Sequence, residues 1–171
     1  DTVTMAPMAV AMAQLGGIGV LHRFLSIDGE AAEVRRVKRY LTHIVAEPYV
    51  VEPGQTVGQA RAEAARLSVT GLVVVGAAQQ LLGLITARDM LAGEDGQCVE
   101  KLMTPRERLV TGPPGIDLPA ARRLLTANRI EKLPLVDDDD RVLGLVTLRD
   151  LALAERYPRA TRDDTGRLRV A

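Results

Sequence analysis

Two short stretches of the sequence carry a threonine, an arginine and an aspartate in the same order and spacing. The residues are Thr86, Arg88 and Asp89 in the first stretch, and Thr147, Arg149 and Asp150 in the second. A carboxylate can accept two hydrogen bonds from ribose hydroxyls, and a guanidinium can hold a phosphate through two parallel bonds. A threonine hydroxyl suits either group. These residue types would suit a ligand that carries both a sugar and a phosphate.

Further residues would complete such a site. Lys132 stands just before a short apolar run and adds a cation, while Val51, Val110 and Thr111 would border an apolar slot for the base. The same pattern also has a structural meaning, because a Thr-x-x-Asp sequence after a strand can cap a helix. The two roles can coexist, since the groups that cap the helix would also line the cleft.

The two stretches belong to a longer internal repeat. Residues 83–90 recur as residues 144–151, an offset of 61 positions, and the same offset pairs Pro53 with Pro114 and Arg61 with Arg122. The register holds from residue 53 to residue 90 without a gap. We expect each copy to be one supersecondary unit that buries its apolar face against the other copy.

Each copy predicts the order strand, helix, strand, strand, helix. Thr56 and Asp117 are the expected N-caps of two helical stretches, residues 57–67 and 118–128. Apolar runs predict two strands in each copy, at residues 72–75 and 81–86 and at residues 133–136 and 142–147. Short helices should begin near Ala87 and Leu148, and extended apolar segments lie ahead of each copy, at residues 49–51 and 109–111.

The segments outside the repeats have no partner in the sequence. Residues 5–15 predict a helix closed by Gly16, residues 18–21 a buried strand, and Ser26 caps a helix that runs to about Leu41. Residues 167–170 are typical of the start of one more strand. A helix, a strand and another helix in succession indicate a parallel α/β architecture.

Composition narrows the class of protein. Lys plus Arg and Asp plus Glu balance at 22 each, so no net field favours nucleic acid or an anionic membrane. No apolar run reaches the roughly 18 residues of a transmembrane helix. The single cysteine, Cys98, gives no sign of an oxidising compartment, and we expect a cytoplasmic protein. Because the chain starts at Asp1 rather than at an initiator methionine, we expect a piece of a longer protein.

The sequence predicts no metal centre and no catalytic nucleophile. Residues 137–140 are four aspartates at a predicted hairpin turn, but their counterparts at residues 76–79 carry no carboxylate, which favours a solvated turn. His22 and His43 lack metal-ligand spacing, and a structural role is expected for His22. Cys98 has no neighbouring base that would activate it.

The repeated Gly-apolar-apolar-Thr-x-Arg-Asp pattern resembles the CBS family, over about residues 45–155. The segments around it resemble the IMP dehydrogenase family, in which a CBS pair is inserted into a (β/α)8 barrel. The motifs that carry this second resemblance are DTVT at residues 1–4, GGIGVLH at 16–22, AAEVRRVK at 31–38, MTPRERLVT at 103–111, RIEKLP at 129–134, YPRATRDD at 157–164 and GRLRV at 166–170. Phe24 departs from the family, which usually has Asn at this position.

The resemblance implies an α+β (mixed α/β) fold: a tandem CBS pair of β-α-β-β-α repeats with flanking fragments of the barrel. The implied parts are barrel-derived residues 1–43, a first CBS repeat at 44–103, a second at 104–156 and a return to the barrel at 157–171. The family implies binding of ATP or other purine nucleotides, with Asp89 and Asp150 on the ribose. It also implies a homodimer or higher homo-oligomer formed through CBS pairs.

For the parent enzyme the resemblance implies oxidation of IMP to XMP, with NAD and a monovalent cation as cofactors. The family's catalytic cysteine loop is absent from this sequence, so the chain itself is expected to be regulatory and to need no cofactor. Two alternatives stay open. The parent could be a GMP reductase-like enzyme, or the pair could be a structural oligomerisation module without a ligand.

Overall fold

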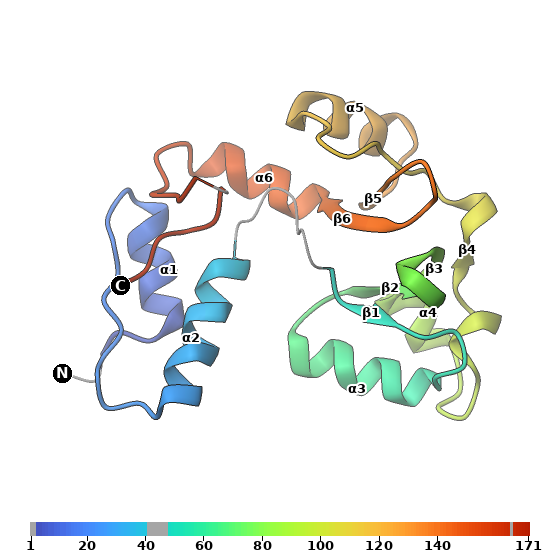
Figure 1. Cartoon of the computed structure of the whole chain (residues 1–171), viewed down its shortest axis with the longest axis horizontal. Helices are drawn as coiled ribbons and strands as arrows, with labels where there is room; N and C mark the ends of the chain where they lie inside the picture. Colours follow the sequence, from blue (N-terminus) through green and yellow to red (C-terminus); the bar gives the residue numbers. More distant parts are fainter. Residues whose placement is uncertain (1–2, 41–47, 165) are drawn as a thin grey trace. The chain divides into compact units, whose positions relative to one another are not determined.

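The chain divides into two units in the computed structural model, which describes residues 3–40, 48–164 and 166–171 (Figure 1). One unit, which we call the repeat unit, is Ala46–Leu145. The other, which we call the flanking unit, combines Asp1–Val45 with Val146–Ala171. His43 and the expected domain boundary at residues 43–44 lie outside the described residues. The described chain is mixed α/β, as the sequence predicts.

The first repeat copy forms a four-stranded sheet in the order β1-β2-β3-β4. β1 and β2 are parallel, whereas β2, β3 and β4 are successively antiparallel. The strands are β1 (Val50–Val51), β2 (Gly71–Val75), β3 (Leu81–Thr86) and β4 (Thr104–Pro105). The helices of this copy are α3 (Val57–Leu67) and α4 (Ala87–Ala92), with 3-10 turns η1 (Ala77–Gln79), η2 (Val99–Lys101) and η3 (Arg106–Arg108). The predicted strand–helix–strand–strand–helix order is confirmed for this copy.

Local sequence explains these elements. Thr56 caps α3 in a reciprocal capping box with Gln59, in which each side chain accepts a backbone N–H of the other residue. All five residues of β2 are buried, which matches an apolar run without polar alternation. The core joins both helices to the sheet and consists of Val51, Val57, Ala60, Ala64, Leu72, Val74, Ile85, Met90 and Val99.

The second copy has the last four elements of this order, α5 (Leu118–Ala127), β5 (Lys132–Val136), β6 (Val142–Thr147) and α6 (Leu148–Arg156). Asp117 caps α5, as predicted, by accepting the N–H of Ala120 at 2.6 Å. β5 and β6 form a two-stranded sheet. The extended segment predicted at residues 109–111 is not a strand; pairing in this region is a single parallel bridge between Gly112 and Leu135.

Residues that are 61 positions apart also share unusual backbone conformations. Left-handed residues occur in matching positions, Ser68 (φ 55°) with Arg129 (φ 53°) and Gln79 (φ 63°) with Asp140 (φ 58°). The parallel pair Val51–Val74 likewise corresponds to the bridge between Gly112 and Leu135. A non-glycine residue in this region is uncommon, so matched pairs are strong evidence of duplication.

Equivalent positions of the two copies also meet each other inside the repeat unit. Gln80 and Arg141, which are 61 residues apart, form an isolated antiparallel bridge. Next to it, the N–H of Leu81 donates to the carbonyl of Asp140 at 2.8 Å, and the Asp140 carboxylate pairs with Arg106. An antiparallel contact between equivalent residues is the mark of a local two-fold axis between the copies.

The flanking unit contains α1 (Ala6–Gln14), α2 (Ile27–Arg39) and α6. Both predicted N-terminal helices are confirmed, and Ser26 caps α2 through the N–H of Gly29. Glu33, a buried carboxylate on α2, accepts the N–H of Ala6 at 2.7 Å and so ties α2 to the start of α1. The small core of this unit consists of Ala6, Ala9, Val10, Ala13, Leu21, Val37 and Leu168.

The two strands predicted in this unit are wrong for the described residues. Instead of strands, Gly19 makes a parallel bridge with Val170, and Leu168 makes an antiparallel bridge with Arg162. Val20 is 62% exposed. A strand requires a continuous ladder on a neighbouring strand, and the described residues supply only single bridges here.

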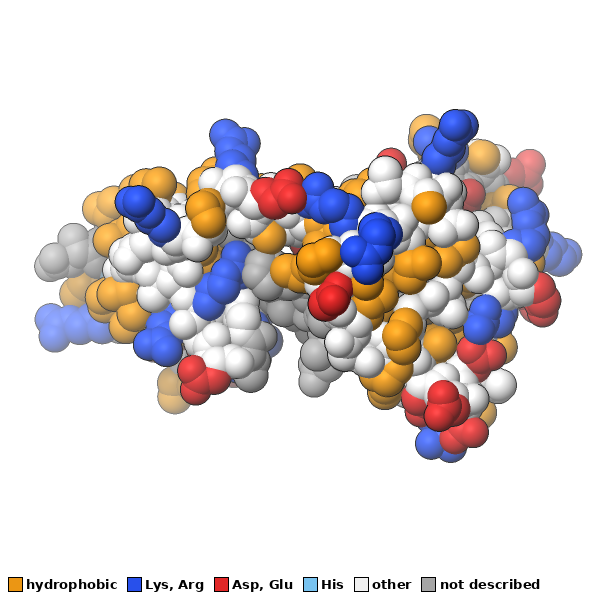
Figure 2. Space-filling model, turned by 90° about the horizontal axis from the view of Figure 1, so that it is seen from above, with side chains coloured by type: hydrophobic (Ala, Val, Ile, Leu, Met, Phe, Trp, Pro, Cys, Tyr) orange, Lys and Arg blue, Asp and Glu red, His pale blue; other side chains and the backbone are white. Residues whose placement is uncertain are grey.

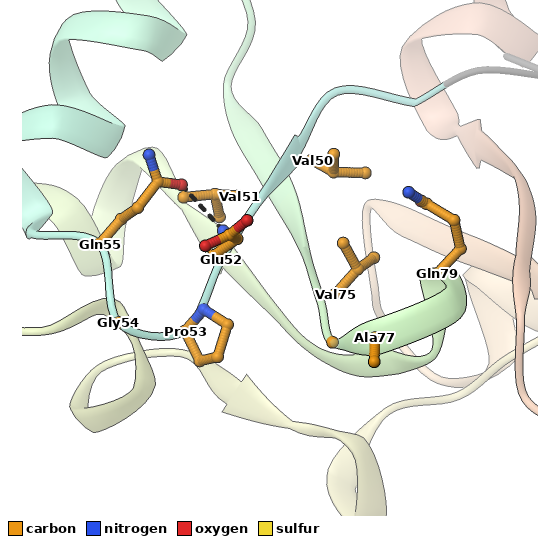
Figure 3. A pocket seen from close by; sticks show the side chains of 10 residues that line it. Val50, Val51, Glu52, Pro53, Gly54, Gln55, Val75, Ala77 and Gln79 are labelled. Carbon is orange, nitrogen blue, oxygen red and sulfur yellow. Dashed lines mark hydrogen bonds between the residues drawn. The ribbon is translucent and has the colours of Figure 1, made fainter.

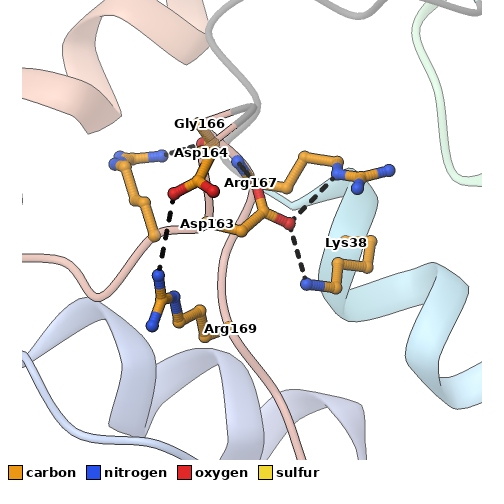
Figure 4. Close-up of polar contacts among 7 residues, drawn as sticks. Lys38, Asp163, Asp164, Gly166, Arg167 and Arg169 are labelled. Atoms are coloured by element: carbon orange, nitrogen blue, oxygen red, sulfur yellow. Dashed lines mark hydrogen bonds and ion pairs between the residues drawn. The ribbon is translucent and has the colours of Figure 1, made fainter.

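Charged side chains of the flanking unit are paired with one another (Figure 4). Asp163 lies 3.0 Å from Lys38 of α2 and 3.3 Å from Arg167, while Arg169 lies 3.9 Å from Asp164. This network joins α2 to the C-terminal segment, so we assign it a structural role. Acidic and basic side chains are also interspersed on the surface seen in Figure 2. None of the helices in the described ranges has the length and apolarity needed to cross a bilayer.

Candidate functional site

Thr86 and Asp89 form a reciprocal cap where β3 ends and α4 begins. The N–H of Asp89 donates to the Thr86 hydroxyl oxygen at 3.4 Å. In return, the N–H and hydroxyl of Thr86 donate to Oδ2 of Asp89 at 2.8 and 2.7 Å. The helix-cap role is therefore confirmed. Both bonds use Oδ2, and no residue in the described ranges donates to Oδ1, so half of this carboxylate remains free for a ligand.

Thr147 and Asp150 repeat this arrangement at the start of α6. The N–H of Asp150 donates to the Thr147 hydroxyl oxygen at 3.2 Å, and that hydroxyl donates to Oδ2 of Asp150. Burial raises the pKa of Asp150 above its ordinary value, although the hydrogen bond from Thr147 and the charge of Arg149 oppose the shift. A half-buried carboxylate with incomplete compensation is a group that gains from a hydrogen-bonding ligand.

The two arginines lie on the surface. Arg88 on α4 and Arg149 on α6 are both exposed, each one residue before the aspartate of its copy. An exposed guanidinium keeps its five donors available to a phosphate, without the cost of breaking an internal ion pair. Their placement is consistent with the predicted contact to an anionic group.

Lys132, at the start of β5, is the most unusual of the candidate residues. Its side chain is only 8% exposed, and its ammonium group lies 4.0 Å from the carboxylate of Glu131, which is itself 78% exposed. Burial lowers the pKa of Lys132, against the opposing effect of the charges of Glu131 and Asp89. Lys132 of the second copy therefore lies near the start of the Thr86–Asp89 cap of the first copy, within the repeat unit.

The remaining candidates are placed differently. Thr111 is half-buried next to the Gly112 bridge, and no hydrogen bond or ion pair among the described residues links it to Asp89 or Lys132. Val51 is buried in the core of the first copy. Thr147, Arg149 and Asp150 belong to the flanking unit, whereas the other candidates belong to the repeat unit.

A cleft that the sequence did not predict lies at the carboxyl end of β2, whereas the Thr86–Asp89 cap lies near the amino end of that strand (Figure 3). Its volume is about 540 Å³, and it is bordered by the ends of β1 and β2 and by η1. The lining residues are Val50, Val51, Glu52, Pro53, Gly54, Gln55, Val75, Gly76, Ala77 and Gln79. The predicted strand order could have indicated this cleft, because the cleft lies at the carboxyl ends of the two parallel strands β1 and β2. Its polar lining contains no cationic side chain, which makes it a poor phosphate site.

Comparison with known proteins shows the family to which the chain belongs. A family model described as the IMP dehydrogenase / GMP reductase domain matches residues 1–171. The inosine-5'-monophosphate dehydrogenase of Bifidobacterium longum is 47% identical over 175 residues, which cover 100% of this chain and 32% of the relative. That of Mycobacterium leprae is 44% identical over 171 residues, 99% of this chain and 32% of the relative. The chain belongs to the IMP dehydrogenase and GMP reductase family.

The fold agrees with this assignment. A GMP reductase from Trypanosoma brucei, whose crystal structure is a complex with guanosine 5'-triphosphate, matches with a TM-score of 0.92 at 35% identity. The match covers 99% of this chain and 42% of that chain. The chain thus spans about a third of the length of the curated IMP dehydrogenases that it matches.

Other reactive side chains of this family member have local contacts. Nε2 of His22 lies 3.2 Å from Sδ of Met5, and Nδ1 accepts the N–H of Phe24. Cys98 is half-buried and forms a β-bridge with Thr56. No group of three metal-ligating side chains occurs within the described residues.

Proposed function

We propose that this chain is the regulatory, nucleotide-binding part of an enzyme of the IMP dehydrogenase and GMP reductase family, a tandem CBS pair with flanking pieces of the catalytic barrel. The observation that carries the proposal is the Asp89 site. There a half-buried carboxylate keeps one oxygen free beside a buried ammonium group from the other copy. A ribose diol fits the free oxygen, and a phosphate fits the cation.

Similarity to the trypanosomal GMP reductase supports a purine nucleotide as the ligand, because its crystal structure is a complex with guanosine 5'-triphosphate. The parent reaction that we propose is oxidation of IMP to XMP by NAD, as in the IMP dehydrogenases that this chain resembles. A GMP reductase parent is the second candidate, favoured by the TM-score of 0.92. We assign no catalytic step to this chain, so mixing it with IMP and NAD should yield no NADH.

Calorimetric titration with GTP and with ATP tests the binding. We expect Asp89→Asn to weaken binding, because the amide keeps a cap acceptor but replaces the charge that grips the ribose. Asp117→Asn is the control, since the Asp117 carboxylate also accepts a backbone N–H at the start of a helix and has no assigned ligand. Absence of binding by both nucleotides at millimolar concentration, or an equal effect of both variants, would disprove the proposal.

Regulation would follow from a difference in nucleotide affinity between assembly states of the parent enzyme. We therefore expect bound nucleotide to change the sedimentation coefficient of the protein. Identical sedimentation coefficients with and without saturating nucleotide would contradict a role of the nucleotide in assembly and leave only the binding proposal.

A further inference from the structure

The two repeat copies keep their threonine, arginine and aspartate but differ at one chemically important position. Lys132 in the second copy corresponds to Gly71 in the first, at the offset of 61 residues. Both residues begin a strand, Gly71 in β2 and Lys132 in β5. The first copy therefore supplies no ammonium group from the position that supplies one in the second.

Gly71 and Lys132 lie next to each other in the structure. A Cβ at position 71 would lie 2.9 Å from the carbonyl oxygen of Ile85, 3.1 Å from Cε of Lys132 and 3.4 Å from Cα of Thr86. The lysine stem thus occupies the space that a side chain at position 71 would need. Glycine in one copy is what allows lysine from the other copy to reach the end of β3, where the Thr86 cap begins.

The charge of Lys132 is incompletely compensated in this position. Its nearest acidic partner, Glu131, is at the outer limit of an ion pair and mostly exposed to water, where it contributes little. Burial of the ammonium group outweighs the opposing charges of Glu131 and Asp89, and the pKa of Lys132 is lowered as a result. A bound anion would relieve the cost, so the site is prepared for negative charge.

We propose that the two nucleotide sites of the chain are unequal, and that the site of Asp89 alone uses Lys132 as a buried anchor for the phosphate chain of its ligand. This rests on the proposed function, which it deepens by assigning polyphosphate selectivity to one site. The site of Asp150 then discriminates less between a nucleoside and its triphosphate. Lys132 is a binding residue that confers selectivity.

Inorganic tripolyphosphate is the probe that isolates this feature, because it has neither base nor ribose. We expect calorimetry to detect one tripolyphosphate bound per chain at the Lys132 anchor. Lys132→Met should weaken it at least tenfold and should lower the ratio of GTP to guanosine affinity by a similar factor. Lys101→Met is the control, since Lys101 is exposed on η2 and its loss changes the net charge equally.

The unaltered protein gives a second measurement that does not depend on folding of a variant. The chain has only three lysines, Lys38, Lys101 and Lys132, so ¹³C-lysine labelling gives a simple NMR spectrum. We expect the Cε resonance of Lys132 to titrate at a lower pH than that of an ordinary lysine and to shift when tripolyphosphate is added. Tripolyphosphate should bind more weakly as the pH rises and the ammonium group loses its proton.

The outcomes separate the two proposals. Nucleoside and nucleotide binding with an unchanged Lys132 resonance would overturn the anchor and leave the nucleotide site intact. Tripolyphosphate binding through Lys132 without any nucleotide binding would support the anchor and overturn the nucleotide assignment. Equal effects of Lys132→Met and Lys101→Met would also overturn the anchor.

Discussion

Removal of the Asp89 carboxylate should affect folding and binding by amounts that can be worked out separately. In Asp89→Ala, the N–H and hydroxyl of Thr86 both lose their acceptor. A helix cap contributes about 0.5–2 kcal/mol and a hydrogen bond to a charged group about 1.5–3 kcal/mol, so we expect a loss of about 2 kcal/mol of unfolding free energy. Asp117→Ala removes one exposed cap bond and should cost about 1 kcal/mol.

Binding distinguishes the two variants more sharply than stability does. Loss of a charge-assisted bond to ribose should weaken GTP binding about 10- to 100-fold in Asp89→Ala. Asp117→Ala should bind GTP as the unaltered chain does. Urea unfolding, monitored by circular dichroism, measures the change in stability. Calorimetric titration of the folded variants measures the change in GTP affinity. Equal GTP affinity of both variants would refute the reasoning, because Asp89 would then serve only as a cap.

Three further predictions concern packing and pH. Leu72→Ala should cost about 2–5 kcal/mol in urea unfolding because Leu72 is fully buried, whereas Leu91→Ala, at an exposed position, should change stability by less than about 0.5 kcal/mol. Gly83→Ala should lower the melting temperature, since a Cβ there would lie 2.7 Å from the backbone oxygen of Thr104; an unchanged melting temperature would contradict this. Because the pKa of Asp150 is raised in the folded state, its contribution favours folding in acid and is lost as pH rises through that pKa. The stability of Asp150→Asn relative to the unaltered chain should therefore increase from low to neutral pH, and a pH-independent difference would count against it.

Much of the fold could be predicted because local signals and the duplication agree. Thr56 and Asp117 mark helix starts in both copies, and the short buried runs that follow have the length and composition of strands. The strands predicted around Gly19 and Leu168 failed for a physical reason. An apolar run indicates burial, but a strand forms only where a neighbour completes the ladder, and single bridges are what the described residues provide.

The candidate site was predictable in its residue types but not in its geometry. Sequence reasoning identified the Thr86–Asp89 pair and its possible cap role, because both follow from spacing along a single chain segment. It gave no indication that the side chain of Lys132 is buried, since lysine is rarely buried and its environment depends on the other copy. The role of Gly71 was hidden for the same reason, because only close approach of two distant segments requires glycine there.

The position at which the copies differ, Gly71 in the first and Lys132 in the second, follows from the local symmetry of the duplication. Residues away from a two-fold axis meet different neighbours, so both copies can keep the same Thr, Arg and Asp. Residues near the axis meet their own equivalents, as Gln80 meets Arg141 and Gly71 meets Lys132. At position 71 a side chain would meet the stem of Lys132, so glycine in the first copy leaves room for the lysine of the second. A duplicated domain can therefore acquire one distinct binding site without changing the residues that the copies share, through a difference such as Gly71 and Lys132 where equivalent residues meet.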